Sequence, residues 1–401
     1  MGVLFGVMLI ISSIQLFRIR KTHSIPYWDK YNIAYALAMA SPVVAIFLSQ
    51  AYHGPFKAEY YDSASRFLLA IPIFLALRQT NIRAITVLQY GLPLGALLGL
   101  TMLKIHPFDW GGNRYTTSSA FNTIHFSDTA LMIGFLSLFS INWKRKDHPL
   151  VLVLKFCGFM AGMYMSIQTG ERGGWVAMPV LMLIGVAAYS KKNVLLKLGI
   201  AISVILASIW LSYLFLEMVH TRIYFIYSDI KYYVDGYKDT SVGERFQLYI
   251  AAFHLFIEHP IFGIGPGQFA HAMPELLARG MLTPFGAQAG ISEVHNEILH
   301  SCAETGLFGL LSILSVYLVP LFVFLRSAKS VIPLIRVSSF MGICLSVGFF
   351  IFGLTVETFD LKMTATFFAF TLAILMATVT RHELPPKNSL PAKGDIKTSS
   401  F

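Results

Sequence analysis

The chain has 401 residues, of which 55% are hydrophobic and 13% are charged. Because a soluble domain usually has about a quarter of its residues charged, this composition excludes both a soluble enzyme and a disordered chain. The formal net charge of +10 would suggest nucleic-acid binding in a soluble protein, but here the hydrophobic residues form repeated long runs. The sequence therefore predicts an all-α polytopic integral membrane protein with about 11–12 transmembrane helices.

Eleven hydrophobic segments are long enough, or nearly long enough, to cross a hydrocarbon core that needs about 20 helical residues. They lie at 1–17, 31–52, 66–77, 84–103, 121–143, 149–168, 173–189, 193–214, 298–325, 333–354 and 363–380. The predicted organisation has about eight spans within 1–214, one large loop containing helices at 215–297, and about three spans within 298–380.

The cations indicate how these spans are oriented. Nineteen of the 31 lysines and arginines lie in or beside alternate connections, among them Arg78 and Arg83 after the third segment. Loops rich in Lys and Arg stay in the cytoplasm, so this side is predicted to be cytoplasmic and the loop at 215–297 external. The tail at 381–401, rich in Pro, Lys and Ser, is predicted to be cytoplasmic and disordered.

The external loop is too hydrophobic and too aromatic to be disordered, which predicts that it folds on the membrane surface. Tyrosines cluster in its first part, and an aromatic belt at headgroup depth or a sugar-binding face would both explain them. Ser241-Val-Gly-Glu244 matches a capping box and predicts the start of a helix that Pro260 ends. A hydrophobic stripe at helical spacing follows: Phe246, Ile250, Phe253 and Ile257.

Two arginines stand out at the predicted outer boundary. Arg245 lies in the first turn of the helix, where a cation opposes the helix dipole, so it is either a solvated surface residue or shares a bound anion with the free amides. Arg172 lies among glycines in Gln168-Thr-Gly-Glu-Arg-Gly-Gly-Trp175. Glycines allow close backbone approach and an arginine can bind phosphate by two parallel hydrogen bonds, although snorkelling to lipid headgroups is the common alternative.

Two further motifs require an interpretation. Gly263-Ile-Gly-Pro-Gly267 has the wrong spacing and no preceding strand for dinucleotide binding, so it is predicted to be a tight turn where the backbone approaches another element. His295 and His300 enter a hydrophobic helix five residues apart, about 140° around the helix, whereas a zinc helix needs a spacing of four. We therefore expect no metal and no cofactor.

The histidine segment has a specific spacing. His295-Asn296, nine residues, Gly306, two residues and Gly309 resembles the His-Asn/Ser/Gln-x9-Gly-x-x-Gly motif of the O-antigen ligase family, within the O-antigen ligase/polymerase superfamily. The match is complete and falls at the end of the large loop, as in that family. Looser similarity extends over about residues 60–380, including Asp62-Ser-Ala-Ser-Arg66, whose two charged residues we expect to form a structural pair.

The resemblance implies a ligase-type glycosyltransferase of the bacterial inner membrane, which moves a polysaccharide from undecaprenyl pyrophosphate to the lipid A core at the periplasmic face. It implies His295 as general base, because imidazole titrates near neutral pH, and Arg172 and Arg245 as the pyrophosphate-binding residues. Asn296, Gly306 and Gly309 support the motif, and direct attack would invert the anomeric centre without a metal. An O-antigen polymerase, a protein O-oligosaccharyltransferase and a lipid-linked glycan transporter remain as alternatives.

Overall fold

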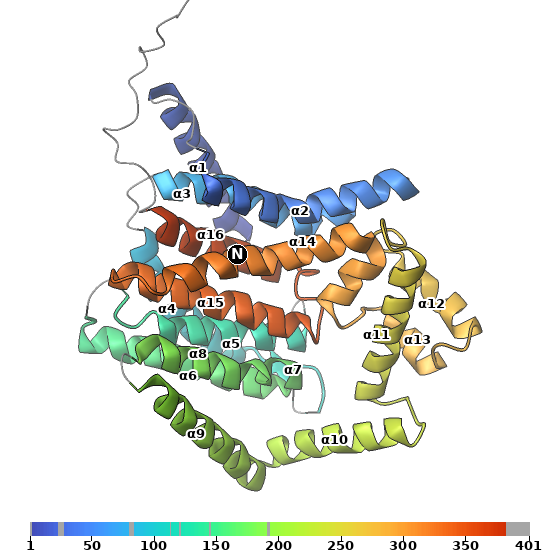
Figure 1. Ribbon diagram of the computed structural model, residues 1–401. Coiled ribbons are helices and arrows are strands. Elements are labelled where there is room, and N and C mark those ends of the chain that lie inside the picture. The colour runs from blue at the N-terminus through green and yellow to red at the C-terminus, as the bar shows by residue number, and fades with distance from the viewer. Residues whose placement is uncertain are drawn as a thin grey trace, which may run out of the picture.

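The computed structural model describes residues 2–22, 28–79, 84–112, 114–119, 122–143, 146–190 and 193–381. The regular structure of these residues is helical apart from one short strand pair (Figure 1). The elements are α1 (Gly2–Thr22), α2 (Lys30–His53), η1 (Ala58–Tyr60), α3 (Tyr61–Gln79), α4 (Ala84–Ile105), β1 (Phe108–Asp109), β2 (Tyr115–Thr116), α5 (Thr123–Phe139), α6 (Pro149–Thr169), α7 (Arg172–Trp175), α8 (Ala177–Tyr189), α9 (Val194–Phe215), α10 (Glu217–Val234), α11 (Ser241–Glu258), α12 (Phe269–Ala278), α13 (Pro284–Gly290), α14 (Glu297–Ser327), α15 (Pro333–Gly353) and α16 (Lys362–Thr380).

The prediction of an all-α polytopic membrane protein is confirmed. Each of the eleven hydrophobic segments coincides with a helix, and eight helices of the described residues are long and apolar enough to cross a membrane. Of the other three, α1 and α5 contain shorter apolar stretches and α3 ends in buried Arg78. The tail beyond Arg381 and the connections at 80–83, 144–145 and 191–192, with their predicted cations, lie outside the described residues.

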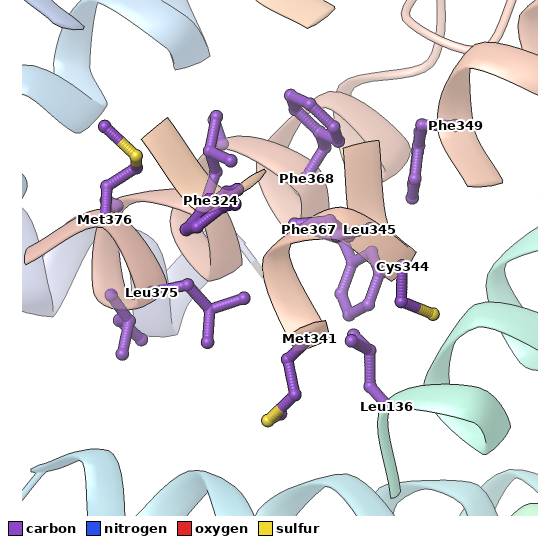
Figure 2. Close-up of a cluster of buried hydrophobic side chains, with 14 of the residues drawn as sticks. Leu136, Phe324, Met341, Cys344, Leu345, Phe349, Phe367, Phe368, Leu375 and Met376 are labelled. Atoms are coloured by element: carbon purple, nitrogen blue, oxygen red, sulfur yellow. The ribbon is translucent and has the colours of Figure 1, made fainter. Parts of the chain in front are cut away.

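The core of the bundle lies around α16, which is buried on all its faces between α3, α14 and α15. Figure 2 shows the aromatic part of this core, where Phe349 of α15 lies beside Phe367 and Phe368 of α16. In lipid the hydrophobic effect does not drive helices together, so their association depends on close packing, which glycine permits. A Cβ on Gly162 of α6 would lie 2.5 Å from the carbonyl oxygen of Ala130 of α5, so only glycine fits.

Ionic contacts fix the end of the bundle where α2 begins and α3 and α16 end. Arg78, assigned above to a cytoplasmic connection, is 1% exposed and binds Asp29 through two nitrogens at 2.7 and 2.5 Å. The same guanidinium donates to Asn32 Oδ1 at 2.7 Å and to the carbonyl of Thr380 at 2.9 Å. Because the carboxylate neutralises it inside the fold, Arg78 ties α2, α3 and α16 together and is not a free loop cation.

The opposite end carries α11, α12 and α13, which lie beyond the ends of α14 and α15 (Figure 1). Their inner faces form a separate small core that includes Leu248, Leu255, Phe269 and Met273. Helix α11 packs against α14, α13 and α10, so this unit is joined to the membrane bundle through the start of α14. We refer to this end of the molecule as the site end.

Candidate functional site

His295 lies in the turn before α14, and its backbone is fixed in an unusual conformation by hydrogen bonds. Its φ is 61°, a left-handed conformation that few residues other than glycine adopt and that often marks a functional position. The hydroxyl of Tyr249, from α11, donates to the carbonyl of His295 and lies equally close to that of Leu354, both at 2.9 Å. Asn296 then caps α14 by accepting from the amides of Ile298 and Leu299 at 3.0 Å.

A carboxylate that the sequence analysis did not select faces the imidazole. Glu293 Oε1 lies 3.0 Å from His295 Nδ1, and both side chains are about six-sevenths buried, at 15% and 14% exposure. Burial disfavours ionisation of Glu293, but the contact with His295 and the charge of His125 outweigh it and lower the pKa of the carboxyl. Because Nδ1 faces Glu293, Nε2 is the nitrogen left to accept a proton from a substrate.

Arg245 reaches the same region from α11. The helix begins as predicted but its cap is Thr240, not Ser241, because the Thr240 hydroxyl accepts from Gly243 N at 3.1 Å. Arg245 therefore lies one turn before Tyr249, which it affects electrostatically. Among the described residues, nothing partners the buried Nε of Arg245. A buried, unpartnered guanidinium donor fits the interpretation of an anion site better than that of a solvated surface arginine.

The hydrophobic stripe predicted for α11 exists but faces outward. Its four residues are 42–57% exposed, while the buried face of the helix is formed by smaller residues such as Ala251 and Ala252. The sequence periodicity identified an apolar face correctly. It could not distinguish packing against protein from exposure at the membrane boundary, because both need the same pattern.

Arg172 is placed by the predicted glycine turn, which forms α7. A Cβ on Gly173 would lie 2.5 Å from Thr355 Oγ1, and one on Gly174 would lie 2.4 Å from Asp128 Oδ1. Close approach of this turn to α5 and α15 therefore requires glycine, as predicted. Arg172 Nη1 contacts the carbonyl of Arg222 at 3.4 Å, and Arg172 interacts electrostatically with Arg245.

Two further arginines join this group. Arg222 of α10 has its Nη2 beside Gly170, 2.8 Å from where a Cβ would be, and the side chain of Arg114 reaches the same glycine. Arg114 also lies 3.4 Å from Glu171 Oε1. Nothing in the local sequence of either arginine indicated this role, because their proximity to Arg172 comes only from the packing of α10 and the β1–β2 turn against α6 and α7.

The motif glycines have a structural explanation. Helix α14 breaks at Gly306, with φ 63° and ψ −146°, and a Cβ there would lie 2.4 Å from the carbonyl oxygen of Ile261. Just before this break, the backbone carbonyls of Ala303 and Glu304 accept hydrogen bonds from the amides of Ile264 and Gly265, at 2.9 and 3.0 Å. The turn at 263–267 therefore does approach another element, as predicted, and that element is the break in α14.

Gly309 and the other charged residues named above are also accounted for. A Cβ on Gly309 would lie 2.1 Å from the carbonyl oxygen of Ser301, so the second motif glycine is required on the same helix. His300 does not join His295, because it lies between Glu357 and Glu304, 3.1 and 3.4 Å away. Asp62 forms its ion pair with Lys362 of α16, at 2.5 Å, and not with Arg66, which acts on Asp62 only through its charge.

The geometry thus gathers His295, Arg172 and Arg245 at the site end, linked by Tyr249, Glu244 and Glu293. Burial raises the pKa of Glu244, while the charges of His295 and Arg245 act to lower it. An imidazole facing a carboxylate can take a proton from a hydroxyl group, and Arg245 and Arg172, with Arg222 and Arg114 beside Arg172, can stabilise a polyanionic leaving group.

Comparisons with known proteins match the part of the chain that carries these residues. Residues 157–314, which contain His295, Arg172, Arg245 and both motif glycines, match the family model described as O-Antigen ligase. The chain is 24% identical over 277 residues to an uncharacterized protein of Haemophilus influenzae, with 67% of each chain covered. It is 26% identical over 196 residues to an O-antigen ligase of Escherichia coli, covering 47% of this chain and 44% of that protein, less than half its length. These matches show that this multi-pass membrane protein is similar to the O-antigen ligase family over residues 157–314.

Proposed function

We propose that the protein is an O-antigen ligase, a glycosyltransferase that moves a polysaccharide from undecaprenyl pyrophosphate to the core oligosaccharide of lipid A. The reaction would take place at the periplasmic face of the bacterial inner membrane, in lipopolysaccharide biosynthesis. The observation that carries this proposal is the convergence of His295, paired with Glu293, and the arginines Arg172 and Arg245 at one end of the bundle. The family match supports the same activity.

His295 is the general base of the proposed reaction. Its Nε2 takes the proton of the acceptor hydroxyl as the hydroxyl oxygen attacks the anomeric carbon of the donor sugar. The bond between that carbon and the pyrophosphate oxygen breaks, and its electron pair leaves with undecaprenyl pyrophosphate. The configuration at the anomeric carbon is inverted because the acceptor attacks opposite the leaving group. Glu293 stabilises the imidazolium that forms, as a carboxylate does in other base–carboxylate pairs.

Arg172 and Arg245 bind the pyrophosphate and offset its growing charge. Guanidinium groups match phosphate oxygens with two parallel donors, and a partly buried site makes their charges more effective than they would be in water. The unpartnered Nε of Arg245 is an available donor for this purpose. Arg222 and Arg114 add positive charge on the side of Arg172. The proposed reaction needs neither a metal nor ATP, because the donor is already activated.

A second candidate activity is carried by the same geometry. An O-antigen polymerase or a protein O-oligosaccharyltransferase would use the same donor with a different acceptor, and the E. coli match favours the ligase. A transporter for the lipid-linked glycan would be expected to place charged residues at the middle of its helices. Here the arginines and His295 gather at the ends of helices, which favours an enzyme.

The experiment that tests the proposal is transfer by the purified full-length protein from undecaprenyl-pyrophosphate-linked glycan to lipid A core, with a chelator and without ATP. Ligated product supports the ligase, polymerised lipid-linked glycan supports the polymerase, and no product contradicts both. If His295→Ala, present in normal amounts, still ligates at the wild-type rate, the base assignment is wrong.

A further inference from the structure

A polar cavity of about 490 Å³ lies beside Glu293, separate from the arginine group. Its walls come from α2, η1 with the start of α3, the segments 266–270 and 290–293, α14 as far as Val316, and the segment 357–362. Glu293 lines this cavity and also contacts His295, so it forms a wall shared by the cavity and the proposed base. The proposed reaction as described so far makes no use of this space.

The cavity is strongly acidic. Seven carboxylates line it, whereas its cationic groups are Lys362 and His300: the carboxylates are Glu59, Asp62, Glu293, Glu297, Glu304, Glu357 and Asp360. Such a lining repels a pyrophosphate, for which the four arginines offer a complementary site elsewhere. The electrostatics therefore separate two binding regions at the site end, one for the phosphates of the donor and one for a ligand without phosphate.

His300 lies between Glu304 and Glu357, Lys362 pairs with Asp62, and backbone amides hold two of the carboxylates. Glu297 accepts from the amide of Phe359 at 2.9 Å and Glu304 from that of Gly267 at 2.9 Å, so each is held by its own backbone donor. No three of the described His, Cys, Asp and Glu side chains converge as metal ligands. A carboxylate has about four lone-pair sites, so these groups keep acceptors for further donors. Many fixed acceptors on the walls of one cavity match a hydroxyl-rich, uncharged saccharide.

A second hollow, of about 350 Å³, adjoins the cavity, and Tyr60 and Pro266 line both spaces. Gln50 lines this hollow and is 3% exposed, and its Oε1 has no hydrogen-bond partner among the described residues. A buried amide oxygen without a partner is costly unless a ligand or water donates to it. Tyr60 borders both spaces and offers an aromatic face for a sugar ring.

We propose that the acidic cavity and the adjoining hollow past Tyr60 bind the acceptor, as an uncharged stretch of oligosaccharide, and present its hydroxyl group next to His295. The inference rests on the proposed function and adds to it a division of labour between acceptor and donor. The acceptor sugars occupy the carboxylate-lined side of Glu293, and the donor pyrophosphate occupies the arginine side.

Filling the cavity tests this assignment. Ile46 of α2 lines the cavity and is half-buried, so Ile46→Trp occupies part of the space. Ile33→Trp is the matched control, because Ile33 lies on the same helix, 46% exposed, and lines neither space. We expect Ile46→Trp to raise the KM for the acceptor at least about tenfold and to leave the KM for the donor unchanged. Ile33→Trp should leave both values unchanged.

A binding titration keeps this test independent of turnover. The probe is dephosphorylated core oligosaccharide released from lipid A, titrated calorimetrically into purified His295→Ala protein with and without Ile46→Trp. We expect binding in the first protein and at least about tenfold weaker binding in the second. Glu59→Gln, which changes charge without volume, should weaken binding in the same direction and serves if the Trp variant does not fold.

Two results would overturn the assignment: an unchanged acceptor KM with unchanged probe binding in a folded Ile46→Trp protein, or a rise in the donor KM alone. Failure of the proposed function would look different. The wild-type protein would then form no ligated product, while the titration would still report whether the cavity binds saccharide.

Discussion

At the scale of single residues, the site depends on an imidazole and a carboxylate whose nearest atoms are 3.0 Å apart. Tyr249 fixes the backbone of His295 from α11, and Asn296 fixes the start of the next helix. The side chain of His295 thus has little freedom to turn away from Glu293. This arrangement assigns separate functions to the two residues, since the imidazole exchanges the proton and the carboxylate orients the ring.

Replacing the carboxylate tests this division. Glu293→Gln keeps the size of the side chain but removes the charge that stabilises a protonated His295. We expect kcat to fall about 10-fold to 100-fold, less than the loss of up to ~10⁴-fold for removing the base itself, with the KM for the donor unchanged. Initial rates of transfer at saturating donor and acceptor measure the effect. A kcat equal to that of the wild type would mean that Glu293 contributes only to structure.

The same pair makes a prediction about pH. Because the pKa of Glu293 is held below its ordinary value of 4.5, the ionised carboxylate stabilises the folded protein above about pH 4.5. This contribution is lost as the pH falls below that value through the folded-state pKa. The thermal unfolding temperature of the wild type should therefore exceed that of Glu293→Gln at pH 7, and the difference should shrink at pH 3.5. A difference that is the same at both pH values would contradict the assignment.

The arginines are expected to act through their geometry as well as their charge. Arg172→Lys and Arg245→Lys keep the charge but lose the second parallel donor, so we expect kcat/KM for the donor to fall about 10-fold to 100-fold in each. Arg279→Lys is the control, because Arg279 forms exposed ion pairs with Glu258 and Glu275 away from the site. Full activity in the two site variants would show that positive charge alone suffices.

At the scale of elements, the break in α14 organises the site end. The turn at 260–265 donates its amides to the carbonyls that the break leaves free, and Leu307 donates back to the carbonyl of Pro260 at 2.8 Å. The turn and the break in α14 approach each other so closely that a Cβ on either Gly263 or Gly306 would lie within 2.4 Å of a backbone atom of the other segment. The motif spacing between His295 and Gly306 therefore corresponds to the length of the first turns of α14, from the N-cap residue Asn296 to the break at Gly306.

Adding one methyl group at the break tests this explanation. Gly306→Ala puts a Cβ against the carbonyl of Ile261 in a left-handed conformation, and we expect it to destabilise the protein by about 1–3 kcal/mol. Gly199→Ala in α9 is the matched control, because no atom lies within 4 Å of its Cβ, and it should change stability by less than about 1 kcal/mol. Thermal unfolding in detergent compares them, and equal unfolding temperatures would refute the packing argument.

Sequence patterns predicted the helices and the local turns well, because each depends on nearby residues. The spans could be predicted from hydrophobic runs. The turns at Arg172 and Gly263 could be predicted because glycine allows the backbone to approach another element closely. The rest depends on packing between distant segments. Glu293 lies two residues before His295 in the chain, but nothing in the local sequence showed that its carboxylate faces the imidazole. Arg222 and the acidic cavity were missed for the same reason, since six separate stretches of the chain form the cavity walls.

At the scale of the whole molecule, the two ends of the bundle have opposite electrostatic designs. At the site end, charged groups are left partly unpaired, as with Arg245, and are available to substrates. At the other end, buried charges are neutralised by each other: Arg78 by Asp29, and Lys155 of α6 by Asp147 at 2.8 Å. These two ion pairs would keep the helices fixed at this end while substrates enter and leave at the site end.

Breaking the pair at the rigid end should therefore affect stability and not chemistry. Asp29→Ala leaves the guanidinium of Arg78 buried without its carboxylate, which we expect to destabilise the protein by about 3–5 kcal/mol. Glu275→Ala removes an exposed partner of Arg279 and should cost less than about 1 kcal/mol. Below the unfolding temperature of Asp29→Ala, its kcat should equal that of the wild type, because most of the length of α2 and α3 separates this pair from the site end. Thermal unfolding and initial rates on the same preparations measure both quantities. A loss of kcat without a loss of stability would show that the two ends are coupled during turnover.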